Sequence, residues 1–542
     1  MFGLVVAFAS VIAWRLFILS YVRHTLYSQT AQAQSQNISN ILIRGNIFIQ
    51  DPKATGTVVD QRYLVATNKK FPLVYATPAT LTDPAGAATQ LASILHIDSA
   101  TLQTSLQGGS TSAKILARKL TDDQVNAINQ LAIKGVGIRY ETDRAYPANA
   151  FLSQVLGFLG YGSIGQVAGQ YGVEGYFDSE LSGTADNASS PQPDDIVLTI
   201  DRNIQTFVET ELHTTLTKWH AAGGSIIVQD PTTGKILAMA QEPTFDPNNY
   251  SVSPTSSYIN ANVQDMFEPG SSFKPITMAM GIDLGKITPD TTYVDPGVIN
   301  IAGRQIHNFD NLAHGTETMT QVLEKSLNTG AAFVENLVGQ DSFTNYAINF
   351  GFGQKTAIDL PGEVSGDIAN LYSGRQVNFV TASFGQGIAV TPIQLITAYS
   401  ALANGGKLMK PYVVDRIIHE GGSEDVTQPE VASIPISPAT SAKVRSMLVS
   451  VVDIGFDKAR IKGYSVAGKT GTAQIADGKG GYLDGVFIHD FLGFAPATNP
   501  KFVVLIKMDK PQGITFAADS LSPSFRDVAA YLLNYYNIPP DR

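Results

Sequence analysis

The sequence predicts two or three domains, the largest of which is an α/β or α+β domain of enzyme size. Three observations lead to this prediction. The chain has 542 residues, too many for one compact core. A small, polar and proline-containing segment at 184–195, TADNASSPQPDD, is typical of a linker. After this segment, apolar runs typical of buried strands alternate with long helical stretches.

The first element along the chain is an apolar segment, residues 1–24, that we expect to span a membrane as a single anchor helix. The runs MFGLVVAFASVIA and LFILSY, joined by WR, together span about 20 residues, enough to cross a bilayer. Arg15 can extend its charge toward one interface. A cleaved signal peptide is the alternative, but its candidate site, AQA at 31–33, lies ten residues beyond Tyr21, too far from the apolar core.

Between the anchor and the linker, the chain carries a polar connector and then helical patterns. Residues 28–40 are rich in Ala, Gln and Ser. Within residues 80–135, the segment AATQLASILHI places Leu91, Ile94 and Leu95 on one face of a helix. This spacing predicts helices that pack through an apolar face.

After the linker, the chain contains apolar strands, long helices and a tight turn. The predicted strands are IVLTI (196–200), GSIIVQD (224–230), KILAMA (235–240) and KFVVLIKM (501–508). The predicted helices include PITMAMGIDL (275–284) and PIQLITAYSALAN (392–404). The sequence DPTTG (230–234) predicts a hairpin turn between two of the strands.

Composition argues against several classes of function. Charged residues make up 15% of the chain and the net charge is −10, which argues against nucleic-acid binding. The absence of cysteine excludes disulfides, thiolate zinc sites and a cysteine nucleophile. His307, Asp310 and His314 could hold zinc, but a loop of hydrogen-bonded polar residues is the preferred interpretation. We therefore expect no metal and no cofactor.

The segment GYSVAGKT (463–470) matches the pattern of a phosphate-binding loop. That loop requires a helix to begin at its Lys-Thr, because a helix N-terminus holds the phosphates. Here the residues before Gly468 look extended, and the segment after Thr470 is rich in glycine without a helical period. We therefore interpret Lys469-Thr470-Gly471 as part of a strand that lines an active site, where the glycine allows close approach of a substrate.

A nucleophile for such a site is found in FEPGSSFK (267–274). Ser271 and Lys274 are spaced i and i+3, so on a helix the amine lies one turn from the hydroxyl. A desolvated lysine of lowered pKa can serve as the base that a serine nucleophile needs. A third element, Ser326-Leu327-Asn328, precedes another helical stretch. Each motif is common alone, but their order within one domain is specific.

With these motifs the chain resembles the class B penicillin-binding proteins, which are membrane-anchored peptidoglycan D,D-transpeptidases. The resemblance covers nearly the whole length and departs from the family after Ile47, where the chain reads FIQDPKATG. The blocks that carry it are NANVQDMFEPGSSFK, SFGQGIAVTPIQL and VAGKTGTAQ after the linker, and RGNI, DRAYP, GFLGYG and GVEGYFDSELSG before it.

The resemblance implies an α+β fold in four segments. A penicillin-binding, serine β-lactamase-like transpeptidase domain, with an antiparallel sheet and helices, would occupy 196–542. An elongated α+β pedestal or dimerisation domain would occupy 25–183, between the anchor at 1–24 and the linker at 184–195.

The resemblance also implies a role for each motif residue. Ser271 would be the acylated nucleophile and Lys274 its general base, and Ser326 and Asn328 would relay protons and contact the substrate. Lys469 would hold the carboxylate of the stem peptide and depress the pKa of Lys274 through like charge.

Two further groups complete the implied site. Thr470 and Thr472, on either side of Gly471, would offer hydroxyls to the same carboxylate. The backbone N–H groups of Ser271 and Thr472 would form an oxyanion hole. The glycines Gly385 and Gly387 of the SFGQG block are interpreted as turn residues.

The expected ligands are peptidoglycan stem peptides and β-lactam antibiotics, with the catalytic domain outside a cell membrane. The chain has no glycosyltransferase region, so by resemblance we expect a SEDS-family membrane glycosyltransferase as partner. The SFGQGIAVTPIQL block and the C-terminal tail look more like division-type enzymes. Arg15 and Arg23 follow the apolar run, so the positive-inside rule alone would place the large domain in the cytoplasm. A short basic segment before the first residue would reverse that assignment.

Two alternatives remain open at this point. The first is a β-lactam-hydrolysing or β-lactam-sensing protein with the same motifs; hydrolysis needs a glutamate base near the serine. The segment GEVSGDIAN (362–370) comes closest to supplying one, although it resembles a transpeptidase block. The second alternative is a scaffold that has kept the fold without the activity.

Overall fold

The computed structural model describes residue 14 and residues 44–54, 61–161, 167–183, 192–476 and 481–542. The predicted anchor, apart from Trp14, the polar connector and most of the linker lie outside these residues. In the part of the chain that is described, no helix combines the length and the apolar character that a membrane crossing requires.

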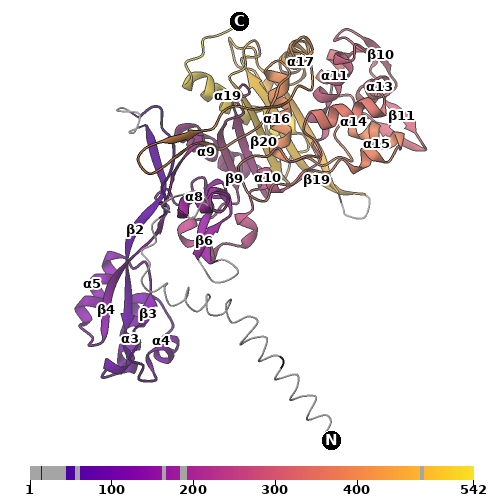
Figure 1. Cartoon of the computed structure of the whole chain (residues 1–542). Helices are drawn as coiled ribbons and strands as arrows, with labels where there is room; N and C mark the ends of the chain where they lie inside the picture. The colour runs from indigo at the N-terminus through magenta and orange to yellow at the C-terminus, as the bar shows by residue number, and fades with distance from the viewer. Residues whose placement is uncertain (1–13, 15–43, 55–60, 162–166, 184–191, 477–480) are drawn as a thin grey trace, which may run out of the picture.

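The N-terminal lobe is narrow and is built on one long strand (Figure 1). Strand β2 (Arg62–Ala76) pairs with β4 (Val136–Ala145) along most of its length and with β3 (Lys114–Ala117) at its far end. Helices α3 (Pro84–Leu95), α4 (Ser99–Leu106) and α5 (Asp122–Leu131) pack beside these strands. As predicted, α3 buries Leu91 and Leu95, and Ile94 is partly buried against the same core.

A second sheet segment joins this lobe to the rest of the chain. Strand β1 (Ile47–Gln50) pairs with β2 and, in parallel, with β7 (Asp195–Asp201). Strand β7 in turn pairs with β15 (Val414–Ile418), which pairs with β16 (Glu424–Val426). The predicted strand at 196–200 therefore exists as β7, but it belongs to the sheet that reaches into the N-terminal lobe.

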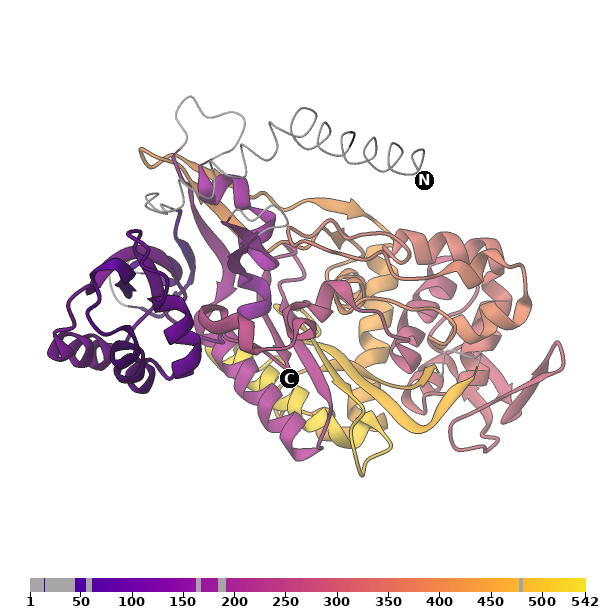
Figure 2. The same cartoon turned by 90° about the horizontal axis from the view of Figure 1, so that it is seen from below.

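A five-stranded sheet, called the large sheet of the second lobe below, is antiparallel throughout (Figures 1 and 2). Its strands in spatial order are β18 (Ala467–Ala476), β19 (Tyr482–Ala495), β20 (Phe502–Asp509), β8 (Gly223–Gln229) and β9 (Ile236–Glu242). The strands predicted at 224–230, 235–240 and 501–508 are thus confirmed. The turn predicted between the first two is confirmed as well, with the Asp230 carboxylate accepting a hydrogen bond from Thr232 N at 2.8 Å.

Helices cover both faces of this sheet. On one face lie α9 (Arg202–Lys218) and α19 (Ser522–Tyr535), joined by stacked rings of Phe207 and Tyr531 with centroids 4.0 Å apart. On the other face lie α11 (Lys274–Asp283), α16 (Pro392–Ala403) and α17 (Pro438–Ser450). The helices predicted at 275–284 and 392–404 are confirmed as α11 and α16.

The remaining elements are short or lie around these layers. They are η2 (Pro78–Thr80), α6 (Ser153–Leu156), β5 (Phe158–Tyr161), β6 (Val167–Gln170), α7 (Gly172–Tyr176), α8 (Asp178–Ser182), η3 (Pro247–Val252), η4 (Thr255–Tyr258), α10 (Ala261–Gln264), η5 (Gly270–Phe273), β10 (Thr292–Asp295), β11 (Val298–Ile301), β12 (Arg304–His307), β13 (Gly315–Thr318), α12 (Met319–Glu324), α13 (Asn328–Val338), α14 (Gln340–Asn349), η6 (Ala369–Tyr372), α15 (Gln376–Ala382), β14 (Leu408–Met409), β17 (Val431–Ser433), η7 (Val451–Gly455), η8 (Asp457–Ala459) and α18 (Ala517–Ser520).

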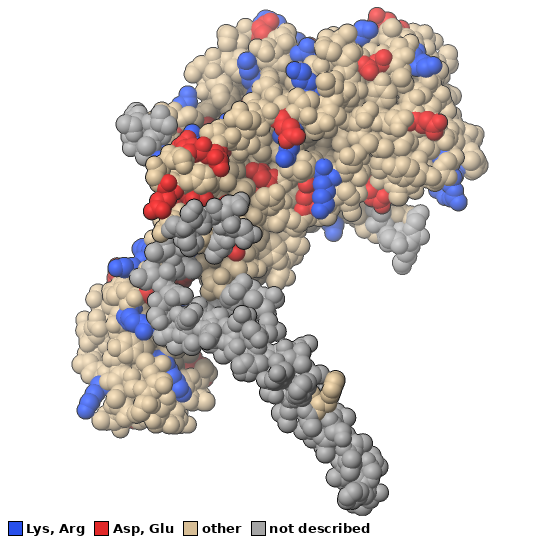
Figure 3. Space-filling model, viewed as in Figure 1, with Lys and Arg blue, Asp and Glu red and all other residues tan. Residues whose placement is uncertain are grey.

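Charge is spread thinly over the surface. On the face shown in Figure 3, small groups of basic and acidic side chains are scattered over a mostly uncharged surface. This agrees with the low charged fraction of the sequence, 15%.

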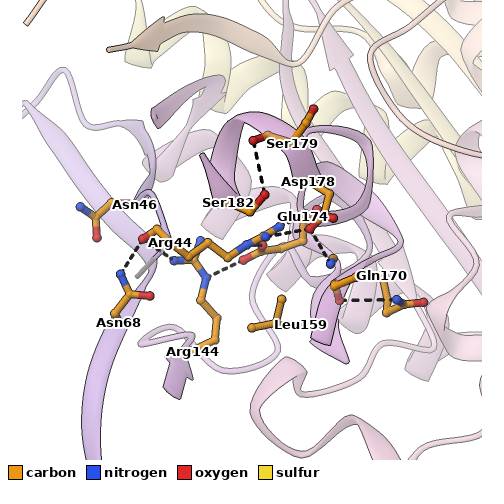
Figure 4. A network of polar contacts seen from close by, with 12 residues as sticks. Arg44, Asn46, Asn68, Arg144, Leu159, Gln170, Glu174, Asp178, Ser179 and Ser182 are labelled. Atoms are coloured by element: carbon orange, nitrogen blue, oxygen red, sulfur yellow. Dashed lines mark hydrogen bonds and ion pairs between the residues drawn. The ribbon is translucent and has the colours of Figure 1, made fainter. Parts of the chain in front are cut away.

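A buried ion cluster holds the base of the N-terminal lobe together (Figure 4). Glu174 of α7 is fully buried and accepts hydrogen bonds from Arg44 Nε at 2.6 Å and from Arg144 Nε at 2.7 Å. Arg44, which precedes β1, also contacts Asp178 Oδ1 at 2.7 Å. Three segments that are distant in sequence therefore meet at one carboxylate.

We predict that Glu174→Gln destabilises the protein by about 3 kcal/mol or more, because it leaves buried guanidinium groups without their counter-charge. Burial alone would raise the pKa of Glu174, but Arg144 and Arg44 outweigh it and lower the pKa. The stabilisation is therefore present above the ordinary carboxyl pKa and is lost as the pH falls. Denaturant unfolding of the variant and the parent measures the difference.

The matched control is Glu141→Gln, which removes a surface pair with Arg118 whose side chains are 30% and 51% exposed. It should cost less than about 1 kcal/mol. Equal costs for the two variants would show that the buried cluster has no special structural weight.

Candidate active site

The Ser-x-x-Lys motif forms a tight helical turn at the edge of the large sheet. Ser271 lies in the turn η5 and Lys274 is the first residue of α11. Lys274 Nζ lies 3.0 Å from Ser271 Oγ, as their spacing predicts. Gly270 provides a φ of +57° that begins the turn, and Pro275 fits the first turn of a helix because it lacks an N–H. The turn therefore presents the hydroxyl and amine to each other.

The Ser-x-Asn motif approaches the same amine from the opposite side. Ser326 adopts a left-handed conformation with φ +55°, an uncommon and strained geometry for a serine. Lys274 Nζ donates to Ser326 O at 2.5 Å and to its Oγ at 3.2 Å. Asn328 begins α13 and its side-chain amide donates to His307 O at 2.8 Å.

The Lys-Thr-Gly motif lies on the edge strand β18. No helix begins at Lys469; the residue is in a strand that pairs with β19, so the phosphate-binding interpretation is excluded. Lys469 Nζ donates to Ser326 Oγ at 3.1 Å and to Thr470 O at 3.1 Å. The amines of Lys274 and Lys469 therefore meet at one hydroxyl, that of Ser326.

Glycine allows the strand and the turn to approach closely. A Cβ on Gly471 would lie 2.4 Å from Pro269 O, and one on Gly385 would lie 2.2 Å from Gly270 O. Gly385 was interpreted as a turn residue, and it does have φ +79°, but it also abuts the turn that carries Ser271. Sequence reasoning missed this second requirement because it depends on a distant segment.

Burial sets the electrostatics of the two lysines, both of which are 0% exposed. Burial lowers the pKa of Lys274 well below its ordinary value, and the nearby charge of Lys469 lowers it further. Burial lowers the pKa of Lys469 to about 7, against an opposing effect of Asp490. Both effects favour the uncharged form of the Lys274 amine, which lies in contact with a serine hydroxyl.

These residues lie at a cavity of about 820 Å³. Ser271, Ser326, Asn328, Lys469, Thr470 and Thr472 line it. Its walls also include five phenylalanines from separate segments, which are Phe309, Phe384, Phe456, Phe487 and Phe516. Phe309 and Phe516 meet edge to face across the cavity wall with centroids 5.6 Å apart. No local sequence pattern links these rings, so sequence analysis missed them.

The other candidate residues are engaged elsewhere. His314 Nε2 lies 2.8 Å from Asp310 Oδ2, whereas His307 accepts a hydrogen bond from the Asn328 side chain through its backbone carbonyl. Across the described residues, no group of three or more potential ligands is placed to hold a metal ion. Glu363, the glutamate of GEVSGDIAN, accepts hydrogen bonds from Thr356 N at 2.6 Å and Ala357 N at 3.0 Å, away from the cavity.

Known protein families match both parts of the chain. Residues 224–530 match the penicillin binding protein transpeptidase domain, and residues 52–191 match the penicillin-binding protein dimerisation domain. Stage V sporulation protein D of Bacillus subtilis is 35% identical over 497 residues, 86% of this chain and 76% of that protein. The peptidoglycan D,D-transpeptidase FtsI of Escherichia coli is 29% identical over 79% of this chain and 73% of its own.

Solved structures show the same fold. Penicillin binding protein 3 from Mycobacterium tuberculosis, complexed with aztreonam, is 31% identical with a TM-score of 0.68, covering 74% of this chain and 92% of that one. Penicillin Binding Protein 2X from Streptococcus thermophilus, at 21% identity, has a TM-score of 0.73 and covers 92% of this chain and 80% of that one. With its transpeptidase and dimerisation domains and these relatives, the chain belongs to the class B penicillin-binding proteins, which makes it a peptidoglycan D,D-transpeptidase.

Proposed function

We propose that Ser271, Lys274, Ser326, Asn328 and Lys469 carry out the D,D-transpeptidase reaction through an acyl-enzyme on Ser271. The observation that supports this most directly is the 3.0 Å contact between Ser271 Oγ and Lys274 Nζ. Because burial lowers the pKa of that amine, it can accept the hydroxyl proton.

Acylation follows from this contact. Ser271 Oγ attacks the carbonyl carbon of the D-Ala-D-Ala bond while its proton passes to Lys274. The oxyanion binds to the backbone N–H groups of Ser271 and Thr472, a contact worth about 3 kcal/mol per donor in comparable sites. The proximity of the two segments supports this pairing, because a Cβ on Gly270 would lie 3.2 Å from Thr472 O.

The C–N bond then breaks and the terminal D-Ala leaves as an amine. Ser326, whose hydroxyl contacts both lysines, relays the proton from Lys274 to that amine. In the second half, the amine of another stem peptide attacks the ester, and its proton returns by the same route to regenerate Ser271.

Residues of strand β18, together with Asn328, position the substrate. Lys469, Thr470 and Thr472 line the cavity beside Ser271, where a cation and two hydroxyls suit the terminal carboxylate of the stem peptide. Thr472 Oγ1 accepts a hydrogen bond from Ala517 N at 3.1 Å, so its hydroxyl proton remains available to that carboxylate.

Hydrolysis of β-lactams is not favoured by this geometry. The acids that line the cavity are Asp310, Glu324 and Asp519. Each is already engaged, with His314, Ser450 and Lys458 respectively. None contacts Ser271, so among the described residues no carboxylate base for deacylation by water lies at the nucleophile.

We further propose that residues 1–24 anchor the chain in a cell membrane, with the catalytic domain outside the cytoplasm. The apolar run of about 20 residues supports the anchor. A SEDS-family glycosyltransferase in the same membrane is the proposed partner, since transpeptidation needs glycan strands that another enzyme polymerises.

We predict that Ser271→Ala abolishes covalent labelling by a penicillin and leaves the fold intact, because the ester oxygen is removed. Intact-mass analysis after incubation with the drug measures the adduct, and Ser272→Ala is the control that should still be labelled. An adduct on the Ser271→Ala variant, mapped to Ser272 or Ser326, would contradict the assignment.

We predict that Lys469→Ala slows penicillin acylation about 10- to 100-fold, since a charge-assisted contact is worth roughly 1.5–3 kcal/mol. Loss of its charge should also let the pKa of Lys274 rise, so the acidic limb of the rate profile moves to higher pH. Stopped-flow acylation across pH measures both effects.

The matched control is Lys462→Ala, at an exposed lysine seven residues earlier, which should leave the profile unchanged. Magnesium-ATP should not raise the melting temperature of the parent or of the Lys469→Ala variant. A nucleotide-induced shift that Lys469→Ala removes, with acylation intact, would overturn the proposed role.

We predict that the full chain fractionates with membranes, keeps its first residue and exposes residues after about 28 to an external protease. Surface proteolysis of intact cells with mass mapping checks this. Release with a new N-terminus at Gln34 would establish a cleaved signal, and protection of the large domain would reverse the orientation.

A further inference from the structure

Asp490 is a fully buried carboxyl group directly behind the active-site strand. It lies on β19, opposite Gly471 of β18 and Lys507 of β20. A Cβ on Gly471 would lie 2.2 Å from Asp490 Oδ2 and 2.4 Å from Pro269 O. The carboxyl group therefore fills the space beneath the Lys-Thr-Gly strand, against the turn that carries Ser271.

No hydrogen bond explains this burial. Neither Asp490 oxygen has a hydrogen-bond partner among the described residues, although both are buried. The neighbouring Ser272 hydroxyl donates instead to Pro269 O at 2.8 Å, and Tyr399 of α16 donates to Ser272 O at 2.6 Å. A buried carboxyl group without a hydrogen-bond partner destabilises the folded protein unless a nearby charge compensates for it.

Two lysines share this face of the sheet, and they differ in their need for a counter-charge. Lys507 Nζ already contacts Asp509, and it lies 5.3 Å from the ring centroid of Phe267. Lys469, two residues from Gly471 on the same face, donates to the neutral oxygens of Ser326 and Thr470, and its Nζ lies 5.6 Å from the ring centroid of Phe456. Asp490 is thus the acid that acts on the charge of Lys469.

We propose that Asp490 is a positioning residue that keeps Lys469 protonated and so sets the pH range in which the site binds a carboxylate-bearing substrate. The inference rests on the proposed role of Lys469 as the group that holds that carboxylate. Asp490 itself is fully buried and does not line the cavity, so it acts on the substrate only through Lys469.

The groups that face the Asp490 carboxyl group determine the direction in which its charge shifts the pKa of Lys469. Burial raises the pKa of Asp490 to about 7, against the effects of the Ser272 hydroxyl and of Lys469 and Lys507. Tyr399 also faces it and stays neutral, since burial raises the pKa of its phenol well above the ordinary value.

Lys469 titrates in the same range as Asp490, and it also faces Lys274. As the pH rises, Asp490 loses its proton, and the resulting negative charge opposes proton loss from Lys469. Without that charge the pKa of Lys469 falls. Carboxylate binding is then lost at a lower pH.

The test compares acylation of the full chain by benzylpenicillin and by its methyl ester across pH 5–9, for the parent and Asp490→Asn. For the free acid, the alkaline limb, where the acylation rate falls at high pH, should move to lower pH by about one unit in the variant. At alkaline pH the variant should therefore be acylated about tenfold more slowly than the parent. For the ester, which lacks the carboxylate, the acylation rates of the parent and the variant should agree within about twofold.

Two further variants separate this role from a structural one. The double variant Asp490→Asn/Lys507→Met removes Asp490 together with the lysine opposite it on β20, and so keeps the test if the single variant does not fold. Its alkaline limb should remain shifted to lower pH. Asp359→Asn, at a partly buried carboxylate that accepts from Val413 N at 2.7 Å, should lower stability without moving the alkaline limb.

Several results would overturn the inference. The first is an alkaline limb of the free-acid profile that stays at the parent pH in both Asp490 variants. The second is an equal slowing of acylation by the ester and by the free acid. The third is recovery of the parent pH profile in the double variant. Failure of the parent to form any adduct would instead refute the proposed function, so the two failures are distinguishable.

Discussion

The meeting of two buried lysine amines at one hydroxyl group is the interaction on which the active site depends. Lys274 and Lys469 both contact Ser326, and Lys274 also contacts Ser271. Two ammonium groups at this depth would repel each other and would lack solvation. Burial and the neighbouring charge both lower the pKa of Lys274 and so favour its uncharged form, which is also the form that the serine nucleophile requires.

The fold brings these groups together from three distant parts of the chain. The helical turn η5, the residues before α13 and the edge strand β18 converge at one end of the large sheet. A second sheet ties this domain to the N-terminal lobe, because β7 pairs with β1 on one side and with β15 on the other. Together with the cluster at Glu174, this pairing fixes the lobe by backbone hydrogen bonds and buried charge rather than through the linker alone.

Sequence analysis identified the features that depend on residues close together in the chain. The spacing of Ser271 and Lys274, the extended residues around Lys469 and the apolar runs of the large sheet were all readable within short windows. The membership of β7 in the other sheet, the second constraint on Gly385 and the position of Asp490 were not, since each depends on pairing with a distant segment. The one available signal for Asp490 was the position of a charged residue directly before the apolar run FLGFA.

The most direct test of the central claim is the pKa of the Lys274 amine, measured by NMR titration of the protein with lysines carbon-13 labelled at the ε position. The resonance can be assigned by its loss in Lys274→Met. The account predicts that this amine is uncharged at pH 7, with a pKa well below the ordinary lysine value of about 10.4. An amine that stays protonated through pH 9 would contradict the account, because Ser271 would then lack its base.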